Sequence, residues 1–258
     1  MELGERRGRF VSAVTHELRT PLTTFCLYSQ MLADGMVRDE SAKREYLNTL
    51  KREANRLAKI VENVLCFARL SEVRSTSRAE ETDAADLLDR TVPTLARRAA
   101  ESGMTLDVDI EALRGATLCV DPQTVERILT NLVDNACKYA AGYCPPGEAG
   151  GSGIADDRIH IRGAVIDRQV SISVADHGPG IPISQRSKVF RAFNRSGSDS
   201  SNTKPGLGLG LSLSRGLARS LGGDLTLGAP PSGSSGAVLT LIIPAAHSAG
   251  VGRSVQTA

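Results

Sequence analysis

Apolar residues recur with a three-four spacing along two N-terminal stretches of the chain, residues 9–33 and 43–70. In the first stretch the recurring positions are Val11, Val14, Leu18, Pro21, Phe25, Tyr28 and Leu32. In the second they are Leu47, Leu50, Ala54, Leu57, Val61, Val64 and Ala68. These are a and d positions of a heptad repeat, which line the seam of a coiled coil or an antiparallel bundle. The pattern therefore predicts a long helical hairpin.

The segment between the two stretches carries residues that end and start helices. Gly35 is placed to end the first helix, and Asp39 or Ser41 to cap the second. Further apolar residues flank the seam, namely Leu22, Met31, Ile60, Leu65 and Phe67. A single hairpin cannot bury all of them, so the pattern indicates dimerisation into a four-helix bundle.

The pattern changes after the hairpin, which is expected to form an all-α domain over residues 1–72. Residues 73–82 are polar without an apolar period and are expected to be a linker. Helices are then expected over residues 84–101, 122–141 and 211–221. Strands are expected near residues 104–110, 117–120, 159–165, 170–174, 224–228 and 237–243. Helices segregated from a meandering sheet indicate an α/β (α+β) sandwich over residues 83–246, and residues 247–258 are expected to be a disordered tail.

Composition narrows the function classes. Lys plus Arg number 31 against 29 Asp plus Glu, so the basic excess of a nucleic-acid binder is missing. No apolar run approaches the roughly 18 residues of a membrane span, and the N-terminus lacks a signal-peptide core. The five cysteines form neither a C-x-x-C pair nor a zinc pattern. We therefore expect reduced thiols and a cytoplasmic location, with no membrane contact in this chain, either as a soluble protein or as the cytosolic part of a membrane-tethered one.

His16 is the first residue that suggests chemistry. In the heptad register it falls at an f position, the outermost point of the helix, where its imidazole is solvated. On residues alone it could be an ordinary surface histidine. However, Pro21 lies one turn further on, and a proline inside a helix costs about 3 kcal/mol or more. One reason for a proline at this position would be a locally loosened helix beside a reactive side chain.

Two later strings suggest a site for a metal ion and a base. Asn131 and Asn135 share one face of the expected helix with Lys138, and amide oxygens suit a hard cation such as Mg²⁺. Asp176 comes where the alternation of a strand stops and is followed by Gly178 and Gly180. A carboxylate there could accept a hydrogen bond from an adenine amino group. Alternatively, the asparagines lie on an ordinary exposed helix face, and the Asp176 string forms only a turn.

The final string, GLGLGL at residues 206–211, opens a helix after a polar tract. Backbone N–H groups freed by Gly206, Gly208 and Gly210 could bind an anion, although the string is not a P-loop. The tract over residues 184–206 is expected to be a mobile lid. At its head, Phe190 and Phe193 are expected first of all to be core anchors.

Taken together these strings resemble the two-component sensor histidine kinases. THELRTPL (15–22) is similar to the phospho-accepting box of that family. The asparagine helix, VADHGPGIP, KVFRAFNR and GLGLGL are similar to its nucleotide-binding boxes and follow in the family order, across roughly residues 8–244. The resemblance implies a dimerisation and phosphotransfer hairpin followed by an ATP-binding domain of the type shared with gyrase and the large heat-shock chaperones.

The resemblance also implies a role for each residue. His16 would take the γ-phosphoryl group of ATP, with Glu17 accepting a hydrogen bond from its ring. Asn135 would ligate Mg²⁺ and Asp176 would read adenine. The remaining nucleotide-binding residues would be Asn131, Lys138, Tyr139, Gly178, Gly180, Phe193, Arg195, Gly206, Gly208 and Gly210. Position 177 is His where the family often has Asn, and position 207 is Leu where Thr or Ser is common; neither departure removes an expected ligand.

The family further implies a partner, the receiver domain of a response regulator, whose Asp would take the phosphoryl group from His16. The pattern H-E-x-x-T resembles that of members that also dephosphorylate their regulator, which would make Thr20 a water-positioning residue. Alternatively, Thr20 is simply tolerated before Pro21.

Two functions of other classes remain as alternatives. One is a kinase-like scaffold that binds ATP and a partner without turnover. The other is a gyrase-type ATPase clamp, against which the heptad hairpin with its exposed histidine argues.

Overall fold

The computed structural model describes residues 2–72, 79–143, 156–194, 207–230 and 235–248. By their contacts the residues form two units. One comprises residues 1–73 and 189–213, and the other comprises residues 74–188 and 214–258. Each unit is described by itself below. Within the described ranges, no helix is both long and apolar enough to cross a membrane.

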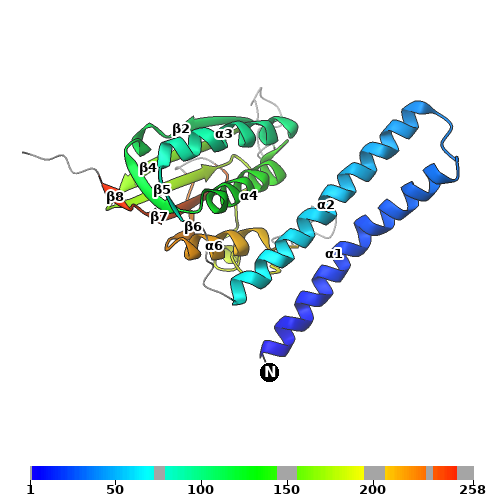
Figure 1. The fold of residues 1–258 in the computed structure, drawn as a ribbon, viewed down its shortest axis with the longest axis horizontal. Coiled ribbons are helices and arrows are strands. Elements are labelled where there is room, and N and C mark those ends of the chain that lie inside the picture. The colour runs from blue at the N-terminus through cyan, green and yellow to red at the C-terminus, as the bar shows by residue number, and fades with distance from the viewer. Residues whose placement is uncertain (1, 73–78, 144–155, 195–206, 231–234, 249–258) are drawn as a thin grey trace, which may run out of the picture. The chain divides into compact units, whose positions relative to one another are not determined.

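The first unit is built on the helical hairpin that the heptads predict. Helix α1 (Glu2–Ala33) and helix α2 (Glu40–Glu72) run side by side in Figure 1. Gly35 between them has a φ of 64°, a conformation that glycine adopts without strain. Of the two candidate caps, Asp39 accepts a hydrogen bond at Oδ2 from Ala42 N at 2.8 Å. Near the turn, Tyr28 packs on Tyr46 with ring centroids 4.5 Å apart.

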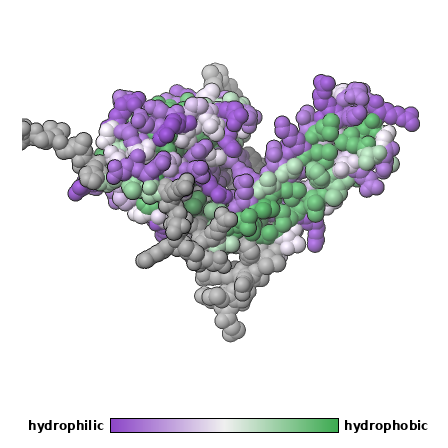
Figure 2. Space-filling model, viewed as in Figure 1, coloured by the Kyte–Doolittle hydropathy of each residue, from purple (hydrophilic) through white to green (hydrophobic). Residues whose placement is uncertain are grey.

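An apolar cluster joins the hairpin to residues 189–213 of the same unit. Ile60, Leu207 and Leu209 are its buried members, and partly buried residues pack around them: Val14, Leu18, Val64, Phe67, Ala192 and Phe193. Ile60 is therefore buried within the chain. Other apolar residues of the hairpin are about half exposed, among them Leu22, Leu27, Leu47, Val61 and Leu65. Figure 2 shows the apolar stripe along the hairpin.

The second unit contains a five-stranded sheet in the order β2-β4-β5-β7-β6. These strands are β2 (Thr105–Asp109), β4 (Arg158–Ile166), β5 (Gln169–Ala175), β6 (Asp224–Gly228) and β7 (Val238–Pro244). Only the β2–β4 pair is parallel among the described strands of this sheet. Helices α3 (Ala84–Glu101) and α4 (Pro122–Ala140) pack side by side against it (Figure 1). Helix α6 (Gly210–Ser220) continues from the first unit into the second.

Period-two alternation explains how the sheet meets its helices. Val170, Ile172 and Val174 of β5 are buried, while the residues between them are only partly covered. The same alternation buries Leu239, Leu241 and Ile243 of β7. Burial of one face of each strand is what the sequence pattern predicts for a sheet covered on one side by helices. Both the hairpin and the α/β fold class are thus confirmed.

A smaller sheet in the order β1-β3-β8 corrects two expectations. Strand β1 (Glu80–Asp83) begins inside the expected linker, and β8 (His247–Ser248) lies in the expected tail. Both pair with β3 (Ala116–Val120). Backbone pairing forms them, so no apolar period marks them in the sequence. The short elements η1 (Glu111–Leu113) and α5 (Ile183–Arg186) were likewise not expected.

Candidate functional site

His16 lies on α1 and is exposed, as its f position predicts. The next residue, Glu17, is buried, and its Oε2 accepts a hydrogen bond from Arg56 Nη2 of α2 at 3.3 Å. This ion pair crosses the hairpin at the level of the histidine. It was missed in the sequence because nothing in the spacing of residues 17 and 56 marks two positions that meet across a hairpin.

Pro21 changes the hydrogen bonding of the turn that follows His16. A proline has no N–H, so Pro21 cannot donate the usual helical hydrogen bond to the carbonyl four residues before it. The neighbouring carbonyls of Arg19 and Thr20 accept additional bonds from the hydroxyls of Thr23 and Thr24, at 2.9 Å and 3.2 Å. Helix α1 nevertheless continues through this turn to Ala33. Thr20, one turn after His16, is exposed on it.

Helix α4 of the second unit carries the asparagine and lysine residues expected at a nucleotide site. Asp121 caps the helix through Gln123 N at 3.1 Å, as expected. Asn131 donates through Nδ2 to Ser214 Oγ of α6 at 2.8 Å. Asn135, one turn further, has a buried Nδ2 without a hydrogen-bond partner among the described residues.

The unpaired amide of Asn135 is the observation that favours a ligand. A buried polar atom without a partner costs about 1–3 kcal/mol, so it calls for a group that the described part of the chain does not supply. An amide can present either its oxygen or its nitrogen by turning over, and the oxygen suits a hard cation with water ligands. The donor set of α4 therefore fits a magnesium ion held with phosphates. Lys138 Nζ lies 5.0 Å from the ring centroid of Tyr139, next to that position.

Asp176 follows the last residue of β5 and is partly buried. Its Oδ1 accepts hydrogen bonds from Gly178 N at 2.9 Å and from Ala237 N at 3.3 Å. Burial raises the pKa of this carboxyl, although the two backbone N–H groups act in the opposite direction. A buried acceptor of this kind can select a ligand that offers it an N–H donor.

Glycines allow the turn after Asp176 to pack closely. A Cβ on Gly178 would lie 3.1 Å from Ala140 Cα, at the end of α4, and 3.0 Å from Asp176 Oδ1. Gly180 has a φ of 70°, and a Cβ there would come within 2.7 Å of the carbonyl oxygen of Gly236. Gly178 thus brings the turn against α4, so Asp176 and the α4 residues form one site.

The remaining expected residues belong to the first unit or lie outside the described ranges. Phe193 has a φ of 62°, donates its backbone N–H to Gly208 O at 3.1 Å, and packs edge-on against Phe67. It thus packs, partly buried, against the apolar cluster around Ile60, as the alternative of a core anchor expects. Gly208 has a φ of 66° and Gly210 begins α6. Arg195 and Gly206 lie outside the described residues.

Sequence reasoning missed a cluster beside Asp176. His177 lies close to His160 of β4 and to Asp156 just before that strand. In the sequence His177 was only a departure from a pattern, and the other two residues carried no signal. Pairing of β4 with β5 brings His160 opposite Ala175, two residues before His177.

Comparison with known proteins gives a match for each part of the chain. Residues 6–73 match the His Kinase A (phospho-acceptor) domain. Residues 120–247 match the histidine kinase-, DNA gyrase B-, and HSP90-like ATPase family.

Several curated relatives cover most of the chain. Signal transduction histidine-protein kinase BarA of Escherichia coli is 28% identical over 230 residues, which is 89% of this chain and 24% of BarA. Sensor histidine kinase AruS of Pseudomonas aeruginosa is 32% identical over 224 residues, 85% of this chain and 21% of AruS. Sensor protein KdpD of Mycobacterium tuberculosis is 28% identical over 245 residues, 93% of this chain and 26% of KdpD. The chain thus spans about a quarter of the length of these relatives.

Solved structures show the same fold. The Acinetobacter baumannii histidine kinase AdeS has a TM-score of 0.63 at 20% identity and covers 90% of this chain and 98% of its own. Full-length ShkA in complex with AMPPNP has a TM-score of 0.61 at 22% identity, over 93% of this chain and 47% of its own.

Replacing Asp176 by an uncharged residue should stabilise the fold, and the gain should depend on pH. The pKa of Asp176 is raised in the folded state. At a pH above the unfolded-state pKa of about 4, the cost of ionising the folded carboxyl therefore lowers the free energy of unfolding. We expect Asp176→Asn to raise the free energy of unfolding of the ligand-free protein at pH 7. The advantage should vanish below about pH 4, where the wild-type carboxyl is protonated in both states. Urea unfolding at both pH values measures it, and an equal or lower stability of the variant at pH 7 would contradict it.

Proposed function

The chain belongs to the sensor histidine kinases, and we propose that it phosphorylates its own His16 with ATP and passes the phosphoryl group to an aspartate of a response regulator. In the first step a ring nitrogen of His16 attacks the γ-phosphorus. The N–P bond forms, the bond from phosphorus to the bridging oxygen breaks, and ADP leaves. In the second step a receiver carboxylate attacks the phosphorus, and the imidazole leaves.

The exposure of His16 is the observation that carries this proposal. A phospho-accepting ring must be reached first by ATP and then by a second protein, and the f position on α1 is open to both. Arg56 of α2 forms an ion pair with Glu17, with Nη2 3.3 Å from Oε2. We propose that Glu17 orients the ring as the hydrogen-bond acceptor that the family resemblance implies, leaving the other ring nitrogen with its lone pair.

The second unit supports ATP as the phosphoryl donor. The buried Asp176 carboxylate suits the adenine amino group, and the unpaired amide of Asn135 suits Mg²⁺, with Asn131 held beside it by Ser214. Mg²⁺, when bound, supplies positive charge that neutralises the transferring phosphoryl group. Lys138, Tyr139, Gly178 and Gly180 complete the expected pocket. Phe193, Arg195, Gly206, Gly208 and Gly210 are proposed for the lid and the phosphates.

We also propose that the protein is a homodimer with a four-helix bundle. Leu22, Leu27 and Leu65 are each at least half exposed on the hairpin, along which Figure 2 shows an apolar stripe. A second hairpin would bury this stripe at roughly 25 cal/mol per Å² of apolar area. We place this core in the cytoplasm, where ATP is available and where its described cysteines would stay free, as they are here. The domain limits at residues 72 and 83 remain proposals.

Replacing the acceptor tests the function and excludes a scaffold without turnover. We expect wild type to incorporate label from [γ-³²P]ATP into an acid-labile, base-stable adduct, and His16→Ala to fall to background because no other described group is proposed as acceptor. His247→Gln, which changes a histidine of β8 outside the site, is the matched control and should label normally. Equal labelling of His16→Ala and wild type, or none in either, would refute the kinase proposal.

The two polar positions of the nucleotide site should fail differently. Asp176→Asn should weaken binding of a non-hydrolysable ATP analogue about 10-fold or more, the loss of a hydrogen bond to a charged group. Asn135→Ala should keep most of this affinity but slow Mg²⁺-dependent transfer about 100-fold, as when one group that stabilises developing charge is removed. Calorimetry and single-turnover labelling separate the two effects. Unchanged affinity in Asp176→Asn would remove the adenine assignment.

Thr20 should support a phosphatase activity. Its hydroxyl lies on the same exposed face one turn from His16, where it can position water for attack on a docked acyl phosphate. We expect Thr20→Ala to autophosphorylate normally but to dephosphorylate the regulator about 100-fold more slowly, the lower end of the range for a positioned catalytic group. Decay of purified phospho-regulator with ADP present measures this. Thr23→Ala, which removes only a hydroxyl bonded to Arg19 O, is the control; identical decay for wild type and Thr20→Ala would leave Thr20 a structural residue.

A further inference from the structure

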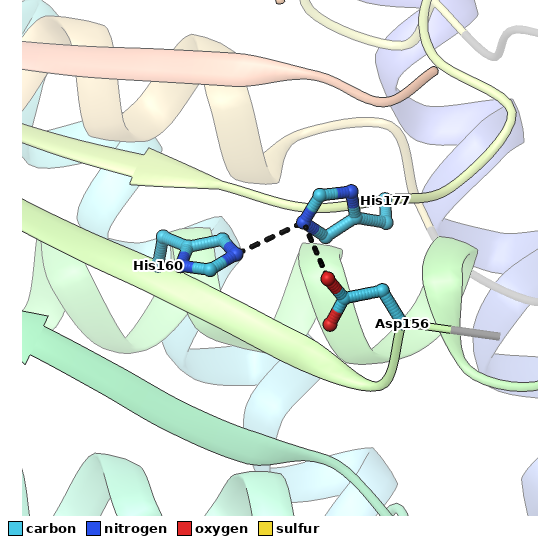
Figure 3. Close-up of side chains that lie close together, drawn as sticks. All are labelled: Asp156, His160 and His177. Atoms are coloured by element: carbon cyan, nitrogen blue, oxygen red, sulfur yellow. Dashed lines mark hydrogen bonds and ion pairs between the residues drawn. The ribbon is translucent and has the colours of Figure 1, made fainter. Parts of the chain in front are cut away.

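Three side chains at the start of β4 and the end of β5 point toward one another (Figure 3). His160 Nε2 and His177 Nε2 are 2.9 Å apart, and His177 Nε2 is 3.4 Å from Asp156 Oδ2. All three potential ligand atoms lie within 4.8 Å of one another. The phosphotransfer chemistry proposed above uses none of these residues.

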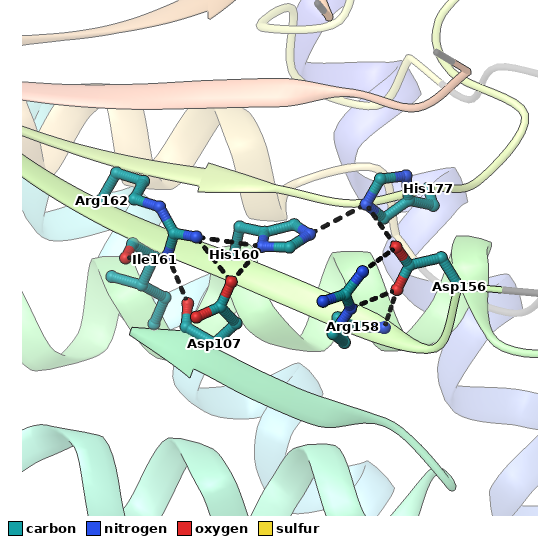
Figure 4. Close-up of polar contacts among 7 residues, drawn as sticks. All are labelled: Asp107, Asp156, Arg158, His160, Ile161, Arg162 and His177. Carbon is teal, nitrogen blue, oxygen red and sulfur yellow. Dashed lines mark hydrogen bonds and ion pairs between the residues drawn. The ribbon is translucent and has the colours of Figure 1, made fainter. Parts of the chain in front are cut away.

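The protonation of His160 follows from its second neighbour (Figure 4). His160 Nδ1 is 2.7 Å from Asp107 Oδ2. Asp107 Oδ2 also forms an ion pair with Arg162 Nη2, and a carboxylate paired with a guanidinium is ionised and can only accept hydrogen bonds. Nδ1 therefore carries the proton and donates it, which leaves the lone pair of His160 on Nε2, facing the cluster. Arg162 Nη2, 3.3 Å from Nδ1, then acts through its ion pair with Asp107.

Asp156 is fixed in a similar way. Arg158 Nε and Nη2 each lie 2.8 Å from one of its two carboxylate oxygens. This bidentate pair holds the pKa of Asp156 well below its usual range. The carboxylate thus stays ionised with Oδ2 directed at His177. Neighbours that orient a ligand and fix its protonation are characteristic of metal sites in proteins.

We propose that Asp156, His160 and His177 bind one divalent transition-metal ion of the zinc class. Two imidazole nitrogens and one carboxylate oxygen are a donor set for Zn²⁺, with a fourth position left for water. Imidazole is a poor ligand for Mg²⁺, so the site is distinct in chemistry from the one on α4.

Two of the three distances between ligand atoms are close to those of a tetrahedral site, and the third, between His160 and Asp156, is within 4.8 Å. With Zn–N distances of about 2.0–2.1 Å, tetrahedral ligand atoms lie roughly 3.3 Å apart. The two nitrogens must separate slightly from 2.9 Å, while the 3.4 Å contact already matches. His177 Nε2 then gives up its contact with His160 and carries its proton on Nδ1. The three side chains are 19%, 28% and 30% exposed for His160, Asp156 and His177, so an ion can enter from solvent.

Metal binding at this place would link three segments of the second unit. Asp156 precedes β4, His160 belongs to β4, and His177 follows Asp176 in the glycine turn after β5. An ion bound only by the folded form stabilises it in proportion to the logarithm of its concentration over Kd. Zinc should therefore raise the melting temperature of this unit, whether or not the protein is a kinase.

Titration of the nucleotide-free full chain with Zn²⁺ against a chromophoric chelator tests the site. Wild type should bind one Zn²⁺ per chain. His177→Asn removes a ligand while keeping a polar side chain in the turn, and the affinity should fall about 100-fold or more. Asp107→Ala touches no metal but removes the acceptor that fixes His160, so we expect a loss of about 10–100-fold. His247→Asn, a histidine outside the cluster, should bind as wild type does.

Further measurements separate a lost ligand from a lost fold. Circular dichroism and binding of an ATP analogue should be preserved in His177→Asn. Zn²⁺ should raise the melting temperature of wild type and of His247→Asn, but not of His177→Asn. Should a variant not fold, the visible spectrum of Co²⁺-loaded wild type decides between four-coordinate imidazole ligation and the octahedral aquo ion. Equal Zn²⁺ affinity in wild type and His177→Asn, no Zn²⁺ binding by wild type, or an octahedral Co²⁺ spectrum would overturn the proposal.

Discussion

The partial burial of the Asp176 carboxylate constrains the turn after β5 and the neighbouring end of α4. A carboxylate in that position needs hydrogen-bond donors. The backbone N–H groups of Gly178 and Ala237 donate to its Oδ1. The first of these comes from a turn that packs closely on α4, where a Cβ at position 178 would lie 3.1 Å from Ala140 Cα. The same packing fixes Asp176 relative to α4, where the buried Nδ2 of Asn135 has no hydrogen-bond partner among the described residues. The Asp176 carboxylate and the unpaired Asn135 amide both reduce the stability of the ligand-free fold. Polar groups of this kind, close together, are typical of a ligand-binding site.

The hairpin of the first unit shows a comparable compromise on a smaller scale. Pro21 removes a helical hydrogen bond just after the residue proposed to react, and the helix is kept by neighbouring contacts. Leu18 packs in the apolar cluster around Ile60, and Glu17 is tied across the hairpin by Arg56. The backbone around His16 is thus held by packing on the inner face of α1. Its outer face remains available for partners.

Sequence patterns predicted those parts of the structure that depend on local rules. The heptads gave the correct hairpin, and Asp121 with Pro122 marked the start of α4 to the residue. The asparagine string was placed correctly on a helix, and the string of Asp176 correctly at the end of a strand, because each lies within one element and its turn. What was missed depends on contacts between distant residues. Strands β1 and β8 exist through pairing with β3, and the Glu17–Arg56 pair and the His160–His177 contact need the finished fold.

Strand register decides whether the histidine cluster exists at all. In the pairing of β4 with β5, His160 is opposite Ala175, and Ile159 and Ile161 on either side of it are fully buried on the opposite face. Moving β4 by one residue would turn His160 into the core and bring both isoleucines out. That exchange would remove two large side chains from the core, at about 1.5–3 kcal/mol each. The hydrophobic pattern of β4 therefore fixes the position of His160 beside Asp107 and His177. A polar site outside the core is in this way specified by the apolar residues that flank it.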